Sequence, residues 1–442
     1  MTTKILFRDV IIALRENAFV TNSYPLILTY EMHCSFKGQK RIAEILKEEV
    51  ADLLYVVSED HDGHQFYAPL SSLMNKIIIK GKGKLPSKEI SLCPGLPKIS
   101  VEVIQPETSP LFLCKDQSSK QEDQTDPSDI ELKIHKMPTL TRNYDVSNEK
   151  PIEVDLNNVK KKKKMTKVKK ILPELNLLYG LIGRKLDLTV PMSIWESVSL
   201  SEGTIKSLYK KNLREIVNYH KKYITKIYPA KHRFDSSNFN PIVGWATGAQ
   251  IIALNFQNFD EFMLINYAKF RNNGGSRCGY VLKPYYMLHD FKEKDHPFFS
   301  EQPKKPIKRV KIQIISGQNL SCIESNSRKI ENIFVEVKVS GLEDEKFNST
   351  KRTHTFSGNS FHPVWANKEK PCIYSFDIAS PDFSTFIFTA YSENLLSKRR
   401  IGWYAVEMTN MQQGYRVIPL LTTDLRTKKH SYIFCHVLIE NI

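Results

Sequence analysis

Apolar spacing in the first 85 residues predicts helices alternating with buried strands. Residues 4–17 place apolar side chains at helical spacing, and the short apolar run 24–30 then predicts a buried strand. A second helix is predicted over about residues 39–54, and the run 76–82 predicts another buried strand. Strands that alternate with helices indicate a parallel sheet or a barrel.

The periodicity is lost between residues 85 and 172. An acidic stretch at 116–131, rich in Ser, Gln and Asp, is followed by a basic run at 160–170. Such composition is typical of a disordered linker. The basic run suits a solvated segment, and a nuclear-import or lipid-binding patch is the alternative.

Helical and strand patterns return after the linker. A strand is predicted over 175–182, helical segments follow up to Tyr223, and strand-like runs lie at 224–228 and 249–256. From about Val310 the chain shows repeated alternating strands at a spacing typical of a β-sandwich. This change predicts a separate C-terminal domain.

Composition adds a preference for anionic partners. The 442 residues carry 64 Lys and Arg against 48 Asp and Glu, a formal net charge of +16, which favours nucleic acid, anionic lipid or phosphorylated small molecules. Seven cysteines are scattered singly, which indicates reduced thiols in the cytosol. The N-terminus lacks a signal-peptide pattern and no apolar run is long enough to span a bilayer, so membrane contact is expected to be peripheral.

Several strings resemble the eukaryotic phosphoinositide-specific phospholipase C family. Two of them, Tyr24–Ser35 and Lys76–Lys82, are similar to the second half of its X region. The strings similar to its Y region are Ile227–Ala230, Arg233–Pro241, Gln250–Gln257 and Asn273–Pro284, the last with a short insertion. The resemblance covers all of the chain except the linker.

The resemblance implies a TIM-like α/β barrel, incomplete because its N-terminal strands are absent, followed by an all-β C2 sandwich. The domains expected are the second half of the X region at 1–85, the linker at 86–172, the Y region at 173–290 and the C2 domain at 308–440. The active site of such a barrel lies at the carboxyl ends of its strands. The implied activity is hydrolysis of phosphatidylinositol 4,5-bisphosphate to inositol 1,4,5-trisphosphate and diacylglycerol in intracellular signalling.

The resemblance assigns binding roles to several residues. Glu31 matches an acidic ligand of the Ca²⁺ cofactor, an ion that prefers oxygen ligands. Lys80 and Lys82, which alternate on a strand, match residues that bind the ring phosphates. Ser199 matches a phosphate hydrogen-bond donor, and Tyr228 matches the residue that packs against the inositol ring. Lys226 stands where the family usually has arginine, so weaker headgroup affinity is expected.

The resemblance also places both catalytic histidines and the other calcium ligands upstream of Met1. His33 and His64 are not expected to replace them, so this chain alone is expected to be inactive. An incomplete start, a degenerate paralogue with a binding role and complementation by a separate chain remain as explanations. The alternative function is that of a catalytically dead phosphoinositide-binding or scaffold protein.

The C2 region departs from the family pattern. Residues 332–337 and 391–400 lack the carboxylates usual at calcium-binding loops, which predicts a Ca²⁺-independent domain that packs on the barrel. Its cations Lys398, Arg399 and Arg400 are expected to touch anionic lipid. The expected location is cytoplasmic and peripheral at membranes. Upstream signalling proteins are candidate partners, no nucleic acid is expected, and the acidic half of the linker is expected to occlude Lys80 and Lys82.

Overall fold

The computed structural model describes residues 4–56, 69–83, 171–271, 278–289, 305–320, 332–342, 348–357, 361–367, 369–393 and 397–442. All of the described residues belong to one compact unit. The predictions for His64 and for both charged stretches of the linker lie outside the described residues.

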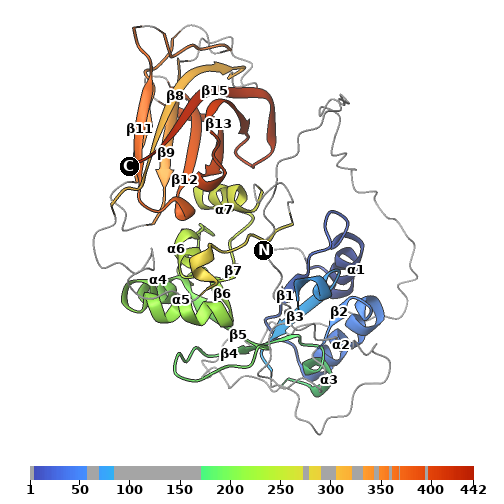
Figure 1. Cartoon of the computed structure of the whole chain (residues 1–442). Coiled ribbons are helices and arrows are strands. Elements are labelled where there is room, and N and C mark those ends of the chain that lie inside the picture. Colours follow the sequence, from blue (N-terminus) through green and yellow to red (C-terminus); the bar gives the residue numbers. More distant parts are fainter. Residues whose placement is uncertain are drawn as a thin grey trace, which may run out of the picture. The chain divides into compact units, whose positions relative to one another are not determined.

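Helices and short parallel strands alternate through the first half of this unit (Figure 1). The elements are α1 (Phe7–Asn17), β1 (Leu26–Thr29), α2 (Phe36–Val50), β2 (Leu54–Tyr55), η1 (Leu70–Leu73), β3 (Ile77–Gly81), α3 (Pro173–Asn176), β4 (Leu181–Arg184), β5 (Glu196–Ser201), α4 (Glu202–Lys211), α5 (Leu213–Lys222), β6 (Ile224–Tyr228), α6 (Ile242–Ala246), β7 (Ile251–Ile252), α7 (Glu261–Arg271) and η3 (Tyr285–Met287). The strands pair in parallel in the order β1-β3-β4-β5-β6-β7, and β2 also pairs with β3. This open parallel sheet with helices confirms the predicted incomplete barrel.

The two faces of the sheet have different roles because side chains alternate along each strand. Ile77 and Ile79 of β3 pack with α1, α2 and α3 on the helix-covered face. Ile78 points the other way, into an apolar layer with Leu181 and Trp195. Lys80, two residues after Ile78, therefore faces the barrel interior directly beyond this apolar layer.

Two predictions in this half were wrong. Residues 175–180 are not a strand, because Leu175 and Leu178, three residues apart, are both fully buried against α2 at helical spacing and Pro173 starts a short helix. Residues 196–201 form β5 rather than a helix. Its alternation places serines on the interior face and Val198 on the helix face, a period of two that the low apolar content concealed.

The C-terminal part is antiparallel and confirms the predicted C2 sandwich. Its elements are β8 (Lys308–Gln318), β9 (Asn332–Ser340), β10 (Thr350–Arg352), β11 (Ile373–Ile378), η5 (Pro381–Phe383), β12 (Thr385–Glu393), β13 (Lys398–Glu407), η6 (Met408–Asn410), β14 (Gly414–Leu421) and β15 (Thr427–Asn441). The order is β10-β9-β12-β13-β14-β15-β8-β11, with β13 and β14 joined by the register pair Trp403–Leu421. The four strands on either side of this thin junction enclose one apolar core.

Helix α7 joins the barrel to the sandwich within this unit. Lys338 of β9 lies 2.7 Å from Glu261, and Lys269 lies 2.8 Å from Glu407 of β13. An apolar cluster that includes Trp403 extends the contact. Contacts between charged partners at the rim of an apolar patch fix the orientation of two packed elements.

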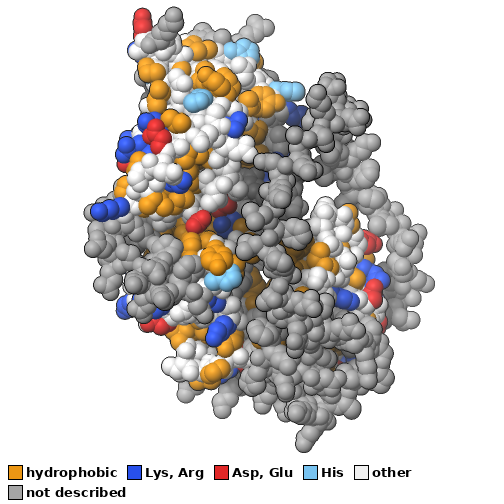
Figure 2. All heavy atoms as spheres, viewed as in Figure 1, with side chains coloured by type: hydrophobic (Ala, Val, Ile, Leu, Met, Phe, Trp, Pro, Cys, Tyr) orange, Lys and Arg blue, Asp and Glu red, His pale blue; other side chains and the backbone are white. Residues whose placement is uncertain are grey.

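Surface composition and cysteines give little further direction. Hydrophobic and basic side chains are interspersed over the described part of the face shown in Figure 2. The described cysteines Cys34, Cys278, Cys372 and Cys435 are not in disulfide bonds. Among the described helices, none has the length and apolar character needed to cross a membrane.

His220 on α5 makes the fold sensitive to acid. The imidazole is fully buried, its Nδ1 donates to the carbonyl oxygen of Thr247 at 2.7 Å, and its Nε2 has no hydrogen-bond partner among the described residues. Burial, with a smaller effect of the nearby Lys283 ammonium, lowers the pKa of His220 to about 3. The unfolded state therefore takes up a proton below about pH 6.5 that the folded state does not, so stability falls as the pH falls.

The free energy of unfolding is expected to fall by about 2 kcal/mol between pH 6.5 and pH 5, because each pH unit contributes about 1.4 kcal/mol. Denaturant unfolding across this range should show a flatter pH dependence for H220Q, whose side chain does not titrate. The control is H33Q, because the His33 side chain is 86% exposed, and it should keep the wild-type slope. Equal slopes for H220Q and the wild type would show that another group is responsible.

Candidate functional site

The predicted headgroup residues lie on neighbouring strands at the carboxyl edge of the sheet. Register pairs Thr29 of β1 with Lys80 of β3, and Ser199 of β5 with Lys226 of β6. Ser199 and Lys226 share the interior face with Lys80, since Val198 and Ile227 occupy the helix face. The sheet thus brings together polar residues that are more than 100 positions apart in the sequence.

Lys80 is the most deeply placed charge of this cluster. The side chain is 2% exposed, and its Nζ donates to Ser199 Oγ at 3.0 Å and to the Val198 carbonyl oxygen at 3.3 Å. Burial, and then the nearby Lys226 ammonium, lower the pKa of Lys80 to about 8. Among the described residues, no carboxylate forms an ion pair with Lys80, and a buried cation in such surroundings favours a bound anion.

Lys226 and Glu31 complete the charged part of the cluster. Burial lowers the pKa of Lys226, while the nearby Glu31 carboxylate acts in the opposite direction. Glu31 follows β1 by two residues, and its side chain is 83% exposed, 3.9 Å from His33. The cluster therefore has two nearby ammonium groups and one exposed carboxylate.

Lys82 and Tyr228 lie at the rim around this cluster. Lys82 is exposed just beyond β3. The aliphatic part of its side chain lies over the interior face of β4, because a Cβ built on Gly183 would point there and lie 3.8 Å from Lys82 Cγ. Gly81 lies between the two lysines. A side chain at this position would clash, because an added Cβ would lie 2.3 Å from the Tyr179 ring. Tyr228 ends β6, is half-buried, and pairs with Ser201.

Sequence reasoning gave no role to Glu202 and Arg233, which hold the loop after β6. Glu202 is buried and accepts two hydrogen bonds from Arg233, at 2.5 and 2.7 Å, and one from the Ala230 amide at 2.8 Å. Arg233 also donates to the Asn238 carbonyl oxygen at 3.0 Å. This bidentate pair anchors the loop that begins directly after Tyr228.

Asn238 fastens the far end of the same loop. Its side chain is 1% exposed and donates to Asp260 Oδ1 at 3.1 Å, and its backbone amide donates to Asp260 Oδ2 at 2.8 Å. The Asn255 amide in turn donates to Asn238 Oδ1 at 2.6 Å. These bonds tie the loop to the segment after β7, so Tyr228 has a fixed backbone on its carboxyl side.

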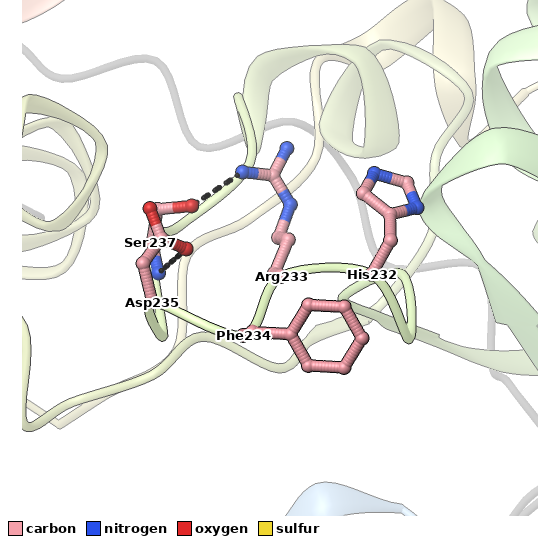
Figure 3. Close-up of a pocket in the computed structure, with 5 residues that line it drawn as sticks. All are labelled: His232, Arg233, Phe234, Asp235 and Ser237. Carbon is pink, nitrogen blue, oxygen red and sulfur yellow. Dashed lines mark hydrogen bonds between the residues drawn. The ribbon is translucent and has the colours of Figure 1, made fainter.

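A shallow pocket of about 430 Å³ opens on this loop, apart from the lysine cluster. Its lining residues are His232, Arg233, Phe234, Asp235 and Ser237. Figure 3 shows Arg233 bonded to Ser237 on one side of the pocket and Phe234 pointing away from them. Arg233 is already paired with Glu202, so we place the chemistry at the Lys80 cluster rather than in this pocket.

The oxygen donors near Glu31 are the candidate ligands for calcium. Ca²⁺ requires six to eight oxygen ligands, usually including several carboxylates. No group of three or more His, Cys, Asp or Glu side chains with metal-binding geometry occurs among the described residues. Glu31 thus fits one ligand position, and the described part of the chain does not form a calcium site by itself.

Comparisons with known proteins identify the family of this open α/β barrel, which has a cationic rim and is joined to a C2 sandwich. The family model for the X domain of phosphatidylinositol-specific phospholipase C matches residues 1–83, and the model for the Y domain matches residues 184–286. The chain belongs to the phosphoinositide-specific phospholipase C family, as the sequence strings indicated.

Relatives of both active and inactive kinds match the whole chain. It is 30% identical over 453 residues to 1-phosphatidylinositol 4,5-bisphosphate phosphodiesterase delta-4 of Bos taurus, covering 100% of this chain and 55% of that protein. It is 27% identical over 449 residues to inactive phospholipase C-like protein 2 of Mus musculus, covering 100% and 35%. The crystal structure of S. officinalis PLC21 matches with a TM-score of 0.68 at 25% identity, covering 99% of this chain and 48% of that one. The chain therefore spans roughly a third to a half of the length of these relatives.

Replacing Lys80 by methionine should stabilise the fold while removing the central cation. Since burial lowers the pKa of Lys80 to about 8, the charged form costs the folded state about 3 kcal/mol at neutral pH. Because the bonds to Ser199 and Val198 are also lost, we expect the free energy of unfolding of K80M at pH 7 to exceed that of the wild type by about 1–2 kcal/mol. Denaturant unfolding measures this difference.

The matched control is K76M at the amino end of the same strand. Lys76 donates to the Asp52 carbonyl oxygen at 3.0 Å outside the cluster, so this change should give no gain. A K80M variant that unfolds more easily than the wild type would show that Lys80 is a structural residue.

Proposed function

We propose that this chain forms the headgroup-binding part of a phosphoinositide phospholipase C that hydrolyses phosphatidylinositol 4,5-bisphosphate. The observation that carries the proposal is the buried Lys80 ammonium, bonded to Ser199 and close to Lys226 at the carboxyl edge of the barrel. Two close cations in a partly desolvated site are suited to a ligand with adjacent phosphates.

Each residue has a distinct role in this proposal. Lys80 and Lys82 bind the ring phosphates, Ser199 donates a hydrogen bond to one of them, and Tyr228 packs against the inositol face. Lys226 neutralises part of the negative charge of the ring phosphates beside Lys80. Glu31, at the open mouth, contributes one ligand to Ca²⁺, an ion that would neutralise charge on the reacting phosphate when bound.

Binding without hydrolysis is the second candidate function. Its support is that the exposed His33 meets the cluster through the Glu31 carboxylate, at 3.9 Å, while the exposed His232 lines the separate pocket after β6. A proton acceptor and donor positioned at the phosphate are required for hydrolysis. A relative named as inactive shows that the family includes proteins without the activity.

Hydrolysis and binding are separated by two assays. Release of inositol 1,4,5-trisphosphate from labelled lipid, with and without Ca²⁺, is measured for the longest native protein that contains this sequence. Binding of the soluble trisphosphate is measured by calorimetry for the 442-residue chain. Binding with Ca²⁺-dependent turnover supports the phospholipase, binding without turnover supports the second candidate, and absence of both excludes headgroup recognition.

Headgroup affinity should depend on the shape of the cation at position 226. Arginine presents two parallel donors to a phosphate where lysine presents a point charge, so K226R should bind inositol 1,4,5-trisphosphate about tenfold more tightly. K226A should bind at least tenfold more weakly through loss of the charge. Equal affinities of the wild type, K226R and K226A would place the ligand elsewhere.

The same titration has a pH signature. Because burial lowers the pKa of Lys80 to about 8, its ammonium loses its proton as the pH rises through this value, and affinity for the anion should fall between pH 7 and pH 9. Bound phosphates raise the pKa of Lys80, so the fall in affinity continues above pH 8 until the pH reaches this raised value. K80M should bind weakly at all pH values, and K76M should show the wild-type curve.

A further inference from the structure

An aromatic ring supports the backbone of Lys80 and Lys82 from the side opposite to their ammonium groups. Side chains alternate along β3, so position 81 faces the helices while the two lysines face the barrel interior. A Cβ added to Gly81 would lie 2.3 Å from both Cε2 and Cζ of Tyr179. The Tyr179 ring therefore fills the space that a side chain at position 81 would need.

A second glycine continues this close contact beyond Lys82. A Cβ added to Gly83 would lie 3.3 Å from Cδ2 of the same Tyr179 ring and 2.0 Å from Asn176 Oδ1. Lys82 thus stands between two glycines, the residues whose backbone loses the most conformational freedom on ordering. If this backbone were unsupported, fixing it around a ligand would weaken binding through that loss of entropy. Contact with the ring restricts the segment before a ligand binds.

Tyr179 is itself held firmly in the fold. Its side chain is 3% exposed and packs in the apolar cluster formed with α1, α2 and α3. The next residue, Gly180, donates its amide to the Ile79 carbonyl oxygen at 2.9 Å. Strand β4 then begins, and its first residue, Leu181, pairs with Lys80. The ring is therefore fixed by apolar packing on one side and by the parallel ladder on the other.

A second tyrosine lies on the same side of the sheet. The Tyr30 amide donates to the Lys80 carbonyl oxygen at 2.9 Å, and the Tyr30 ring packs edge-on against Phe7 with centroids 5.9 Å apart. Burial, and then the nearby Tyr179 hydroxyl, raise the pKa of Tyr30, and burial raises the pKa of Tyr179 to about 12. Both hydroxyl groups are buried and have no hydrogen-bond partner among the described residues. The two tyrosines therefore support β3 by the packing of their rings.

Support from behind the strand fixes the spacing of the two lysines. Lys80 is anchored by its bond to Ser199 at 3.0 Å, whereas the exposed Lys82 depends on its backbone for its position. Two cations at a fixed spacing favour two phosphates at a matching spacing, because little entropy remains to be lost on binding. We propose that Tyr179 is a positioning residue that makes this lysine pair selective for adjacent phosphates on one ring. The assignment rests on the proposed headgroup binding and adds a determinant that does not touch the ligand.

The test compares two soluble probes by calorimetry on the 442-residue chain. Inositol 1,4,5-trisphosphate has adjacent phosphates and inositol 1,4-bisphosphate does not, so the wild type should prefer the trisphosphate. In Y179A the ring is lost, and the ratio of the two affinities should fall by about tenfold. Y179L keeps more of the buried apolar volume and should show a fall in the same direction, so it provides the readout if Y179A does not fold. Y179F should keep the wild-type ratio, because it loses only a hydroxyl without a described partner.

The matched control for lost packing is F19L. Phe19 packs in the same apolar cluster and is not among the atoms nearest to Gly81 or Gly83, so F19L should unfold more easily and keep the wild-type ratio. A wild-type ratio in Y179L, or an equal fall in F19L, overturns the positioning role and leaves the headgroup proposal intact. Equal affinity of the wild type for the two probes has the same meaning. Absence of binding of either probe to the wild type overturns both proposals.

Discussion

The buried ammonium of Lys80 is the constraint on which the rest of the barrel site depends. It stands one interior position above the apolar layer of Ile78, Leu181 and Trp195, where the packed core of the barrel ends. Its bonds to Ser199 Oγ and the Val198 carbonyl oxygen link β3 to β5 across β4. Within the described part of the chain, this cation is partly desolvated and has no carboxylate beside it, an arrangement that favours binding of an anion.

The surrounding structure holds this arrangement in place through the loop after β6. The Glu202–Arg233 pair and the Asn238–Asp260 bonds fix both ends of that loop, and Tyr228 lies at its start. Because these polar groups are buried and mutually bonded, the loop is specified by hydrogen bonds rather than by apolar packing. The site thus combines strand residues that provide charge with a loop that provides a rigid edge.

Sequence patterns revealed the strands whose apolar runs are continuous but missed the one that carries Ser199. The apolar patterns predict β3 and β6 closely. β5 alternates serine with apolar residues, and the pattern predicts helix for this segment instead. The spacing of Lys80 and Lys82 showed that they share a face. The bond from Lys80 to a serine 119 positions away could not follow from periodicity, because pairing of distant strands is set by the whole sheet.

Partners that form only in three dimensions were also missed. Arg233 and Glu202 are 31 residues apart, and nothing in the local pattern connects them. Charge alone predicts lipid contact for Lys398, Arg399 and Arg400, whereas the packing of Lys398 on Phe334 and Tyr391 follows only from the pairing of the strands. The positions of the charges could be predicted from the sequence, whereas the aromatic surface that orients them depends on strand pairing.

The cost of placing Lys80 in the interior bears on the choice between hydrolysis and binding alone. A cation whose pKa burial lowers to about 8 weakens the fold at neutral pH, and a neutral side chain of similar size would fill the position at less cost. That cost is offset only when an anion occupies the site. Chemistry at the phosphate requires further groups, but the lysine cluster is explained equally well whether or not they are present. Headgroup recognition is therefore the property that both candidate functions share, and hydrolysis is an addition to it.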